Sequence, residues 1–517
     1  MDPKDKERVL VEVVQRVFDH FADPRTVEQA LFDTIYHERR RIESGRGNGD
    51  GAGAAFYDRI YREGARASPE RHRELLKDII TAFAEEVAGH FDPRVYALAT
   101  KTIPTALLAL LNTLSPLKLV TGGLGNLDDC FRIGGETGAF KAAASHGTTI
   151  LVPTHSSHLD SILAGYAIYR LGFPPFVYGA GLNLFNNKLI GFFMHNLGAY
   201  KVDRRKKAEL YKDVLKTYAG CTMELGYHNL FFPGGTRTRS GAVEQKLKLG
   251  LLGMGLDAYV HNLMARKPRP DVFIVPCTIN YQLVLEAETL IEDHLKEVGK
   301  SRYIIEDDEF SRPRRVLDFV RQLFSLDSRI HLVVSRPLDV FGNDVDDEGR
   351  SLDHRGRPVD RTRYVMQGGA PAFDDQRDQE YTRELAASVV RAFHRDTVLN
   401  STHLVSHAVF GWLKDRNPGT DLYRLLRTGG AEESIPLADA YARVERSLAG
   451  LRARADGGAV RLDESLTAKD IVALVNEALA HLRSYHRQPA LERRGDRLFH
   501  IDRNLLLYYQ NRVAGVA

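Results

Sequence analysis

The apolar residues of the first hundred positions recur at helical spacing. Val9 and Val13 stand four residues apart, as residues on one face of a helix do. The pattern predicts a helix over 4–44 and then a glycine-rich break at 45–54 (GRGNGDGAGA). Helical spacing resumes after the break, so we expect residues 1–120 to form a helical N-terminal region.

The pattern changes at residue 148, where short apolar runs begin to alternate with helical segments. Thr148-Thr-Ile-Leu-Val-Pro153 is a β-branched apolar run of the kind found in buried strands. Strands that alternate with helices predict an α/β fold, with a mostly parallel mixed sheet flanked by helices, over residues 121–340. The expected strands are 148–153, 176–178, 200–202, 229–232, 272–276 and 330–334, and the expected helices are 158–170, 187–196, 206–219 and 247–264.

The rest of the chain shows two further patterns of apolar and polar residues. Residues 341–380 are rich in Asp, Gly and Arg without an apolar period, which predicts a loop-rich insertion. Residues 381–517 return to helical spacing and predict a helical C-terminal region. Within that region, Thr467 and Asp470 have the spacing of a capping box and predict a helix over 468–485.

Composition narrows the class of protein. The chain has 517 residues, of which 43% are hydrophobic and 27% charged, and this excludes a disordered protein. The 71 Lys and Arg nearly balance the 68 Asp and Glu, and the net charge of +3 excludes a strongly basic nucleic-acid coat. Cys130, Cys221 and Cys277 form no CxxC pair, so we expect three reduced, mostly buried thiols in a cytosolic protein.

No segment of the sequence has the composition of a membrane span. The best candidate lies between Lys101 and Lys118, but it holds only 16 residues and includes two prolines, whereas a spanning helix needs about 20 apolar residues. We expect residues 104–120 to pack within the protein or to lie on a bilayer surface. The charged first residues predict that no signal peptide opens the chain.

The sharpest chemical feature is the run THSSHLD at 154–160, which directly follows a predicted strand. Ligands of parallel α/β sheets bind at the carboxyl ends of the strands. Across the turn, Asp160 can bond one imidazole nitrogen of His155 and leave the other nitrogen free to take a proton. The serines and the aspartate of this run also fit an ordinary helix cap, and the spacing agrees equally well with both interpretations.

A metal site is an alternative chemistry for the same run. His155, His158 and Asp160 resemble part of a metallo-hydrolase pattern in which Thr-His-x-His-x-Asp-His follows a strand. Here the two histidines are three residues apart instead of two, and Ser161 stands at the position of the last histidine. We therefore rank metal binding below general-base chemistry.

Positive charge gathers after two further predicted strands. Arg204 follows the strand at 200–202, and Arg237 and Arg239 lie in the run FPGGTRTRSG at 232–241. The surrounding stretch from 201 to 248 holds eleven Lys or Arg and five Asp or Glu, a local excess of six positive charges. Arginines at strand ends, beside a Gly-Gly turn that frees backbone N–H groups, favour binding of a phosphate.

Nucleic acid is a weaker explanation of this charge. The sequence holds no recognised nucleic-acid motif, and the GxGxxG-like glycines at 122–138 lack a clear strand before them. We interpret Lys206, Lys207 and Lys212 as solvated surface charges.

Four blocks of the chain follow one another in a recognisable order. They are His155-x-x-x-x-Asp160, the block from Gly198 to Arg204, the run Phe232-Pro-Gly-Gly-Thr-Arg237, and Val275-Pro276 with Ile279. Their order and spacing resemble the motif blocks of the glycerol-3-phosphate and 1-acylglycerol-3-phosphate acyltransferases. The segment LLLYYQN at 505–511 resembles a C-terminal segment of the long glycerol-3-phosphate and dihydroxyacetone-phosphate types.

The resemblance implies a glycerol-3-phosphate O-acyltransferase of phospholipid biosynthesis, with the α/β fold of that family. His155 would be the general base, oriented by Asp160, and a glycerol hydroxyl would attack the thioester of acyl-CoA or of acyl-carrier protein. No cofactor and no metal would be needed. Backbone N–H groups near Gly234 and Gly235 would stabilise the oxyanion. The substrate-binding residues would be Gly198, Arg204, Gly234, Gly235, Thr236, Arg237, Arg239 and Lys248, with the three arginines on the phosphate.

The chain departs from the family pattern at one position. The third block of the family usually reads Pro-Glu-Gly-Thr-Arg, and Gly234 stands here at the place of the glutamate. The change suggests a different acceptor, a carboxylate supplied from elsewhere (Glu224 and Glu244 are nearest in the sequence), or reduced activity.

Several functions therefore stay open at the level of sequence. The acceptor can be glycerol 3-phosphate, 1-acylglycerol 3-phosphate or dihydroxyacetone phosphate. The metallo-hydrolase is the second enzyme hypothesis, and a non-catalytic membrane-binding protein on an acyltransferase scaffold is the third. Because acyl chains reside in bilayers, the resemblance also implies a cytoplasmic protein at the inner face of a membrane, with residues 104–120 and the basic stretch as contacts.

Overall fold

The computed structural model describes residues 1–46, 51–100, 130–181, 192, 196–298, 315, 328–430, 432–484 and 486–515. The segment at 104–120 lies outside the described residues, as does most of the helix expected at 187–196.

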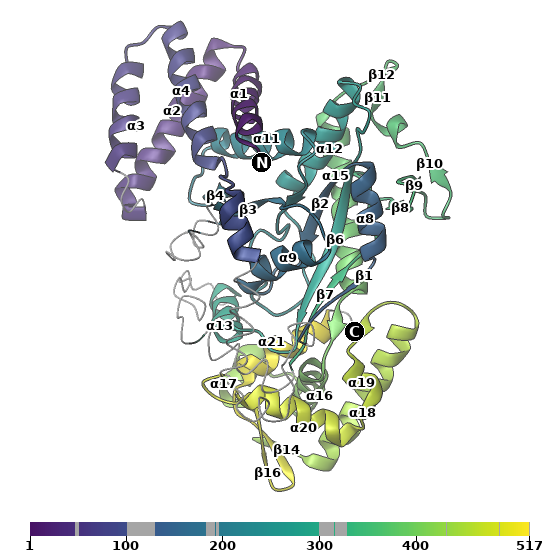
Figure 1. Ribbon diagram of the computed structural model, residues 1–517. Helices are drawn as coiled ribbons and strands as arrows, with labels where there is room; N and C mark the ends of the chain where they lie inside the picture. Colours follow the sequence, from purple (N-terminus) through teal and green to yellow (C-terminus); the bar gives the residue numbers. More distant parts are fainter. Residues whose placement is uncertain are drawn as a thin grey trace.

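A seven-stranded sheet lies at the centre of the molecule (Figure 1). Its strands are β1 (Phe131–Gly135), β2 (Thr148–Pro153), β3 (Val177–Gly181), β4 (Ala199–Val202), β5 (Asn229–Leu230), β6 (Val272–Tyr281) and β7 (Ile330–Val334), in the spatial order β1-β7-β6-β2-β5-β3-β4. Every neighbouring pair is parallel except β6 and β7. The prediction of a mostly parallel mixed sheet is therefore confirmed.

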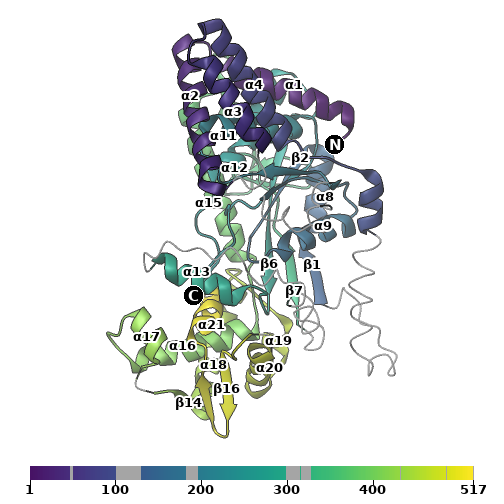
Figure 2. The same ribbon diagram turned by 90° about the vertical axis from the view of Figure 1, so that its left-hand side faces the viewer.

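Helices cover both faces of the sheet, which makes three layers (Figures 1 and 2). On one face, α11 (Glu209–Glu224), α12 (Leu249–Met264) and α15 (Asp375–Arg395) pack together. On the other face lie α8 (Thr137–His146) and α9 (Leu159–Arg170). A strand with helices on both sides has no solvated face, and this explains why every residue of β2 and β6 is buried.

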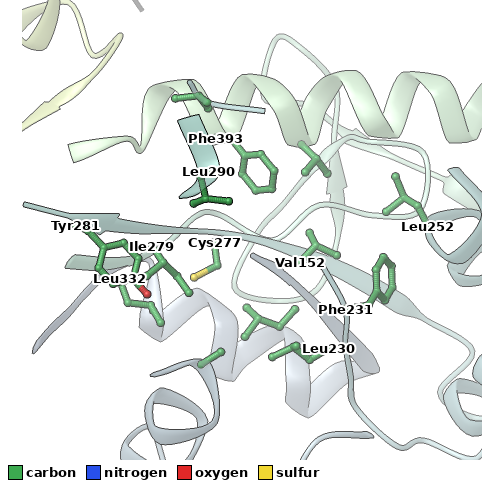
Figure 3. Packing of buried hydrophobic residues seen from close by; sticks show 14 of the residues in the cluster. Val152, Leu230, Phe231, Leu252, Cys277, Ile279, Tyr281, Leu290, Leu332 and Phe393 are labelled. Carbon is green, nitrogen blue, oxygen red and sulfur yellow. The ribbon is translucent and has the colours of Figure 1, made fainter. Parts of the chain in front are cut away.

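The core follows from this layering. Val152 of β2 and Cys277 of β6 lie in adjacent strands, and Phe393 of α15 packs on one side of them (Figure 3). Of the three cysteines, Cys221 and Cys277 are buried and Cys130 is half-buried. The prediction of mostly buried cysteines is confirmed.

Within the central sheet, the strand predictions differ most from the structure at β6 and β1, while β3 ends three residues later than expected and β5 two residues earlier. Strand β6 continues to Tyr281, five residues beyond the expected end, because β7 pairs with its far half. Strand β1 was not among the expected strands, and its sequence FRIGG lies within the stretch that holds the GxGxxG-like glycines at 122–138. Gly135 ends β1 with a φ of +84°, a conformation that glycine adopts readily.

The N-terminal region is helical as predicted, but its first helix is two. They are α1 (Pro3–Asp19) and α2 (Pro24–Arg41), followed by the π-helical turn η1 (Ile42–Arg46), α3 (Gly51–Gly64) and α4 (Pro69–Val87). The single helix expected over 4–44 is wrong because Asp23 caps a new helix, its side chain accepting the N–H of Arg25. The predicted break is also shorter, since α3 already begins at Gly51.

Up to residue 374, the stretch predicted as loop-rich contains only short elements. They are β8 (Asp344–Val345), β9 (Ser351–Leu352), β10 (Pro358–Val359), the 3-10 turn η4 (Arg361–Val365), β11 (Met366–Gln367) and β12 (Ala370–Pro371). Helix α15 then begins at Asp375, a few residues before the predicted boundary.

The C-terminal region is mainly helical and includes small sheets that the pattern did not predict. Its helices are α16 (Ser401–Arg416), α17 (Leu422–Thr428), α18 (Leu437–Asp456), α19 (Glu464–Ala468), α20 (Ile471–Ser484) and α21 (Arg503–Ala514), and α13 (Ala287–Val298) packs on α21. Its strands are β13 (Val398–Leu399), β14 (Ser434–Pro436), β15 (Arg461–Leu462), β16 (Leu491–Arg494) and β17 (Arg497–His500).

The capping box expected at Thr467 is wrong. Thr467 bonds the carbonyl of Glu464 within α19, and Asp470 itself caps the next helix by accepting the N–H of Ala473. Among the described residues, no helix is both long and apolar enough to cross a bilayer.

Candidate active site

Three loops that follow parallel strands meet at one edge of the sheet. His155 follows β2, Arg204 follows β4, and the loop 232–241 follows β5. Strands β2 and β5 are direct neighbours, and the N–H of Thr238 donates to the carbonyl of His155 at 2.7 Å. The edge is the one at which α/β sheets bind ligands.

Asp160 holds His155 through its side chain. Oδ2 of Asp160 lies 2.9 Å from Nδ1 of His155 and also accepts the N–H groups of Ser156 and Ser157, at 2.7 and 2.8 Å. Its other oxygen accepts the hydroxyl of Tyr281, which comes from the extended end of β6. One fully buried carboxylate thus holds the turn that leads into helix α9 and also orients the imidazole, and α9 itself has no side-chain cap at His158.

The surroundings of His155 keep its ring neutral. Burial lowers the pKa of His155, and the charges of Arg237 and Arg204 lower it further, while Asp160 acts in the opposite direction. The effect of burial on the pKa of His155 thus outweighs that of the Asp160 carboxylate. Phe232 stacks on the imidazole with 4.1 Å between ring centroids. With Nδ1 directed at Asp160, Nε2 is the nitrogen that can accept a proton.

Gly234 leaves a space that a distant carboxylate occupies. A Cβ at Gly234 would lie 3.5 Å from Cγ of Glu244, and Oε1 of Glu244 accepts the main-chain N–H of His155 at 2.6 Å. Glu224, the other acidic residue near in sequence, lies at the end of α11 and bonds Arg16 of α1 instead. Of the two carboxylates considered, only Glu244 lies at the site.

Arg237 is held by a second buried carboxylate, Glu286. Nη1 of Arg237 lies 3.5 Å from Oε1 of Glu286. Glu286 also accepts the hydroxyl of Ser157 at 2.7 Å and the N–H of His158 at 3.0 Å. Burial raises the pKa of Glu286, and the Arg237 charge opposes that shift. The loop after β6 therefore aligns the arginine with the turn that carries His155.

Arg204 and Arg239 complete a cluster of three cations with Arg237. Partial desolvation lowers the pKa of Arg204, and the charges of Arg237 and Arg239 add to this shift. Arg239 bonds the mostly exposed Glu297 at 2.6 Å, whereas Arg204 has no carboxylate within ion-pair distance in the described parts of the chain. Mutually repelling guanidinium groups gathered around an imidazole in this way favour the binding of an anion.

Three further residues expected to bind substrate, Gly235, Thr236 and Lys248, lie in or beside the turn that follows β5. Lys248 donates its N–H to the carbonyl of Pro233 at 2.7 Å, and its side chain runs past Gly235, while Thr236 is exposed in the same turn. The N–H of Gly235 closes the turn onto the carbonyl of Phe232 at 3.0 Å, so it is already engaged.

Gly198 is not brought to this edge. It precedes β4, whereas Arg204 follows that strand, and its N–H donates to the carbonyl of His90 at 2.7 Å. Its φ of +89° favours glycine for conformational reasons. Lys206 is also placed differently from our expectation of a solvated charge, because its ammonium is buried between Glu38 and Glu86, at 3.1 and 2.8 Å.

The geometry does not favour the metal interpretation. Asp160 directs both of its oxygens to other partners, as described above. Within the described part of the chain, no three His, Cys, Asp or Glu side chains are placed to hold one metal ion.

Three residues of the site come from positions that sequence reasoning did not select. Tyr281 lay beyond the predicted end of its strand, and Glu286 follows it in a loop. Arg512 lies on α21, is buried, and donates to the carbonyl of Ile279 at 3.4 Å. The LLLYYQN segment lies in this helix, and Asn511 within it donates to the carbonyl of Ser240 at 2.9 Å.

Comparisons with known proteins agree with this geometry. Residues 137–280 match the family model described as Acyltransferase. A protein named glycerol-3-phosphate acyltransferase from Xanthomonas axonopodis pv. citri (strain 306) is 33% identical over 154 residues, which are 30% of this chain and 17% of the relative. A protein of the same name from Pseudomonas fluorescens (strain Pf0-1) is 32% identical over 180 residues, which are 35% and 20% of the two chains.

The aligned part thus spans no more than 20% of the length of these relatives. The resemblance to acyltransferases that the four motif blocks indicated is confirmed across residues 137–280, the segment that carries all four of them.

Proposed function

We propose that this protein is a glycerol-3-phosphate O-acyltransferase that takes its acyl group from a thioester. The observation that carries the proposal is the neutral His155, bonded through Nδ1 to buried Asp160 and placed beside Arg204, Arg237 and Arg239. A base next to an anion site suits a phosphorylated alcohol, since one group can deprotonate the hydroxyl while the others bind the phosphate.

The reaction follows from these positions. Nε2 of His155 removes the proton from the glycerol hydroxyl, and the hydroxyl oxygen bonds to the carbonyl carbon of the thioester. The C–S bond then breaks, and the thiolate leaves with the proton that His155 took. Of the two glycines expected to stabilise the oxyanion, Gly234 keeps an N–H outside the turn bond that engages Gly235. The donor is acyl-CoA or acyl-carrier protein.

The test is release of free thiol from an acyl-CoA in the presence of different acceptors. Glycerol 3-phosphate, dihydroxyacetone phosphate and 1-acylglycerol 3-phosphate are compared at equal concentration, and we expect the first to give the highest rate. His155→Ala should reduce turnover by ~10²–10⁴-fold. Full turnover of His155→Ala would refute the mechanism.

His158→Ala is the matched control for that variant. His158 lies in the same turn, and its backbone N–H, which the substitution keeps, makes the bond to Glu286. Acyl transfer predicts that this variant stays active, whereas a metallo-hydrolase predicts that it loses metal and activity together. Metal analysis of both variants therefore separates the two enzyme hypotheses.

We further propose that the protein works at a membrane surface, on its cytoplasmic face, because its product carries an acyl chain. Binding to anionic liposomes at low salt, and its loss at high salt, is the expected result. A protein that binds liposomes without turnover on any acceptor would instead be a lipid-binding scaffold.

A further inference from the structure

Glu244 bonds the main chain of His155, the candidate base, and the proposed reaction gives it no role. Its Oε1 accepts the N–H of His155 at 2.6 Å, while the carbonyl of His155 accepts the N–H of Thr238 at 2.7 Å. Together with the bond from Nδ1 to Asp160, these contacts hold His155 at three points. A short bond from an N–H to a carboxylate is among the stronger hydrogen bonds in proteins.

Gly234 provides the room for this carboxylate. The φ of Gly234 lies outside the left-handed range, so this angle does not require a glycine there. A Cβ would fit, at 3.5 Å from Cγ and 3.7 Å from Oε1 of Glu244. Any longer side chain at position 234 that points the same way would occupy the volume that the Glu244 side chain now fills.

The remaining oxygen of Glu244 faces the interior. Oε2 is buried and bonds no other group in the described residues. Burial raises the pKa of Glu244 to about 7, the hydrogen bond from His155 and then the charge of Arg512 on α21 lower it, and the charge of Asp160 on α9 raises it. A buried carboxylate oxygen without a partner costs stability, and such groups are found most often at functional sites.

We propose that Glu244 is the positioning residue of His155, and that Gly234 and Glu244 act as an exchangeable pair in which one position supplies the side chain and the other supplies the space. This inference rests on the proposed acyl transfer for its kinetic readout. It answers the question raised by the glycine in the third motif block, because the carboxylate of the site comes from ten residues further along the chain.

Four variants and one control test the pair by thiol release. Glu244→Ala should lower kcat by about 10–100-fold with little change in KM, since a displaced base costs rate and leaves phosphate binding intact. Glu244→Gln should retain most of kcat, because an amide oxygen can accept the same N–H. Gly234→Glu alone should lose as much activity as Glu244→Ala, and the double variant Gly234→Glu/Glu244→Ala should recover about tenfold over Gly234→Glu. Gln245→Ala, at the exposed neighbouring position, is the control and should match the wild type.

A second readout does not depend on turnover. In protein labelled with ¹⁵N-histidine, the main-chain amide of His155 should shift with pH around a midpoint near 7, because its acceptor titrates there. The shift should vanish in Glu244→Gln. An amide without this titration, or Glu244→Ala with full activity, would overturn the inference. An inactive wild type with the titration intact would instead refute the acyl transfer and leave the contact established.

Discussion

The helical regions at the two ends of the chain lie at opposite ends of the molecule and pack on different elements (Figures 1 and 2). The N-terminal helices α1 and α4 pack on α11, and Lys206 is buried in an ion pair with Glu38 and Glu86. The C-terminal helix α21 contacts the site loop itself, through Asn511 on the carbonyl of Ser240. Two regions with the same helical pattern thus have different consequences: one stabilises the sheet, and the other shapes the site.

The largest effect is expected at the N-terminal side, and on stability. Lys206→Met takes from the fully buried Glu38 one of its two cations, since Arg41 stays at 2.9 Å, and it also removes the ion pair with Glu86. Losing these charged hydrogen bonds should cost about 2–3 kcal/mol of unfolding free energy. Denaturant unfolding measures the loss. At a temperature where the variant is folded, its kcat should equal that of the wild type, and a large drop in kcat would contradict the division between the two regions.

A change of similar size is expected at the C-terminal side, but on turnover. Gly241 has a φ of +80°, and a Cβ there would collide with the carbonyl oxygen of Tyr508 in α21. Gly241→Ala should therefore push α21 from the loop that carries Arg237 and reduce kcat/KM by roughly 100-fold. Gly226→Ala is the control, because Gly226 has a φ of +86° with open space around it. Equal losses in both variants would show that backbone strain alone is responsible.

A smaller effect is expected from the hydroxyl of Tyr509. This hydroxyl accepts the N–H of Val284 at 3.3 Å and lies 2.9 Å from Nε2 of His486, so it ties α21 to the loop that leads to Glu286. Tyr509→Phe leaves a buried N–H without its acceptor, which costs about 1–3 kcal/mol of unfolding free energy. We expect kcat to fall severalfold as well. An unchanged kcat with the expected loss of stability would limit α21 to a structural role.

The smallest expected effect is a shift in the pH dependence of kcat/KM. Because the pKa of His155 is below its ordinary value of 6.5, kcat/KM should fall only when the pH drops below that value and the ring becomes protonated. Arg237→Gln removes a repelling charge, so it raises the pKa of His155 and moves the acid limb upward. Lys206→Met, remote from the ring, should leave the limb in place. A limb that moves downward in Arg237→Gln would contradict the electrostatic interpretation.

The predictable part of the molecule is the part built from local interactions. Strands such as 148–153 were recognised because a buried parallel strand must be apolar throughout. The pairing of His155 with Asp160 was also predictable, since five residues span one strand-to-helix turn and the partners have few other places to go. By contrast, β1 was missed because two glycines in five residues suggest a loop until a neighbouring strand supplies the hydrogen bonds.

The sequence by itself thus determined most of the order of strands and helices along the chain, the contact between His155 and Asp160, and the arginines that follow strand ends. Only the tertiary structure decided that Lys206 is buried, that Gly198 lies at the wrong end of its strand, and that Glu244 lies in the space beside Gly234. It also decided that α21, more than 340 residues after His155, packs on the site loop. The physical reason is that hydrogen bonds within a turn follow from local geometry, whereas contacts between distant segments depend on how whole layers pack.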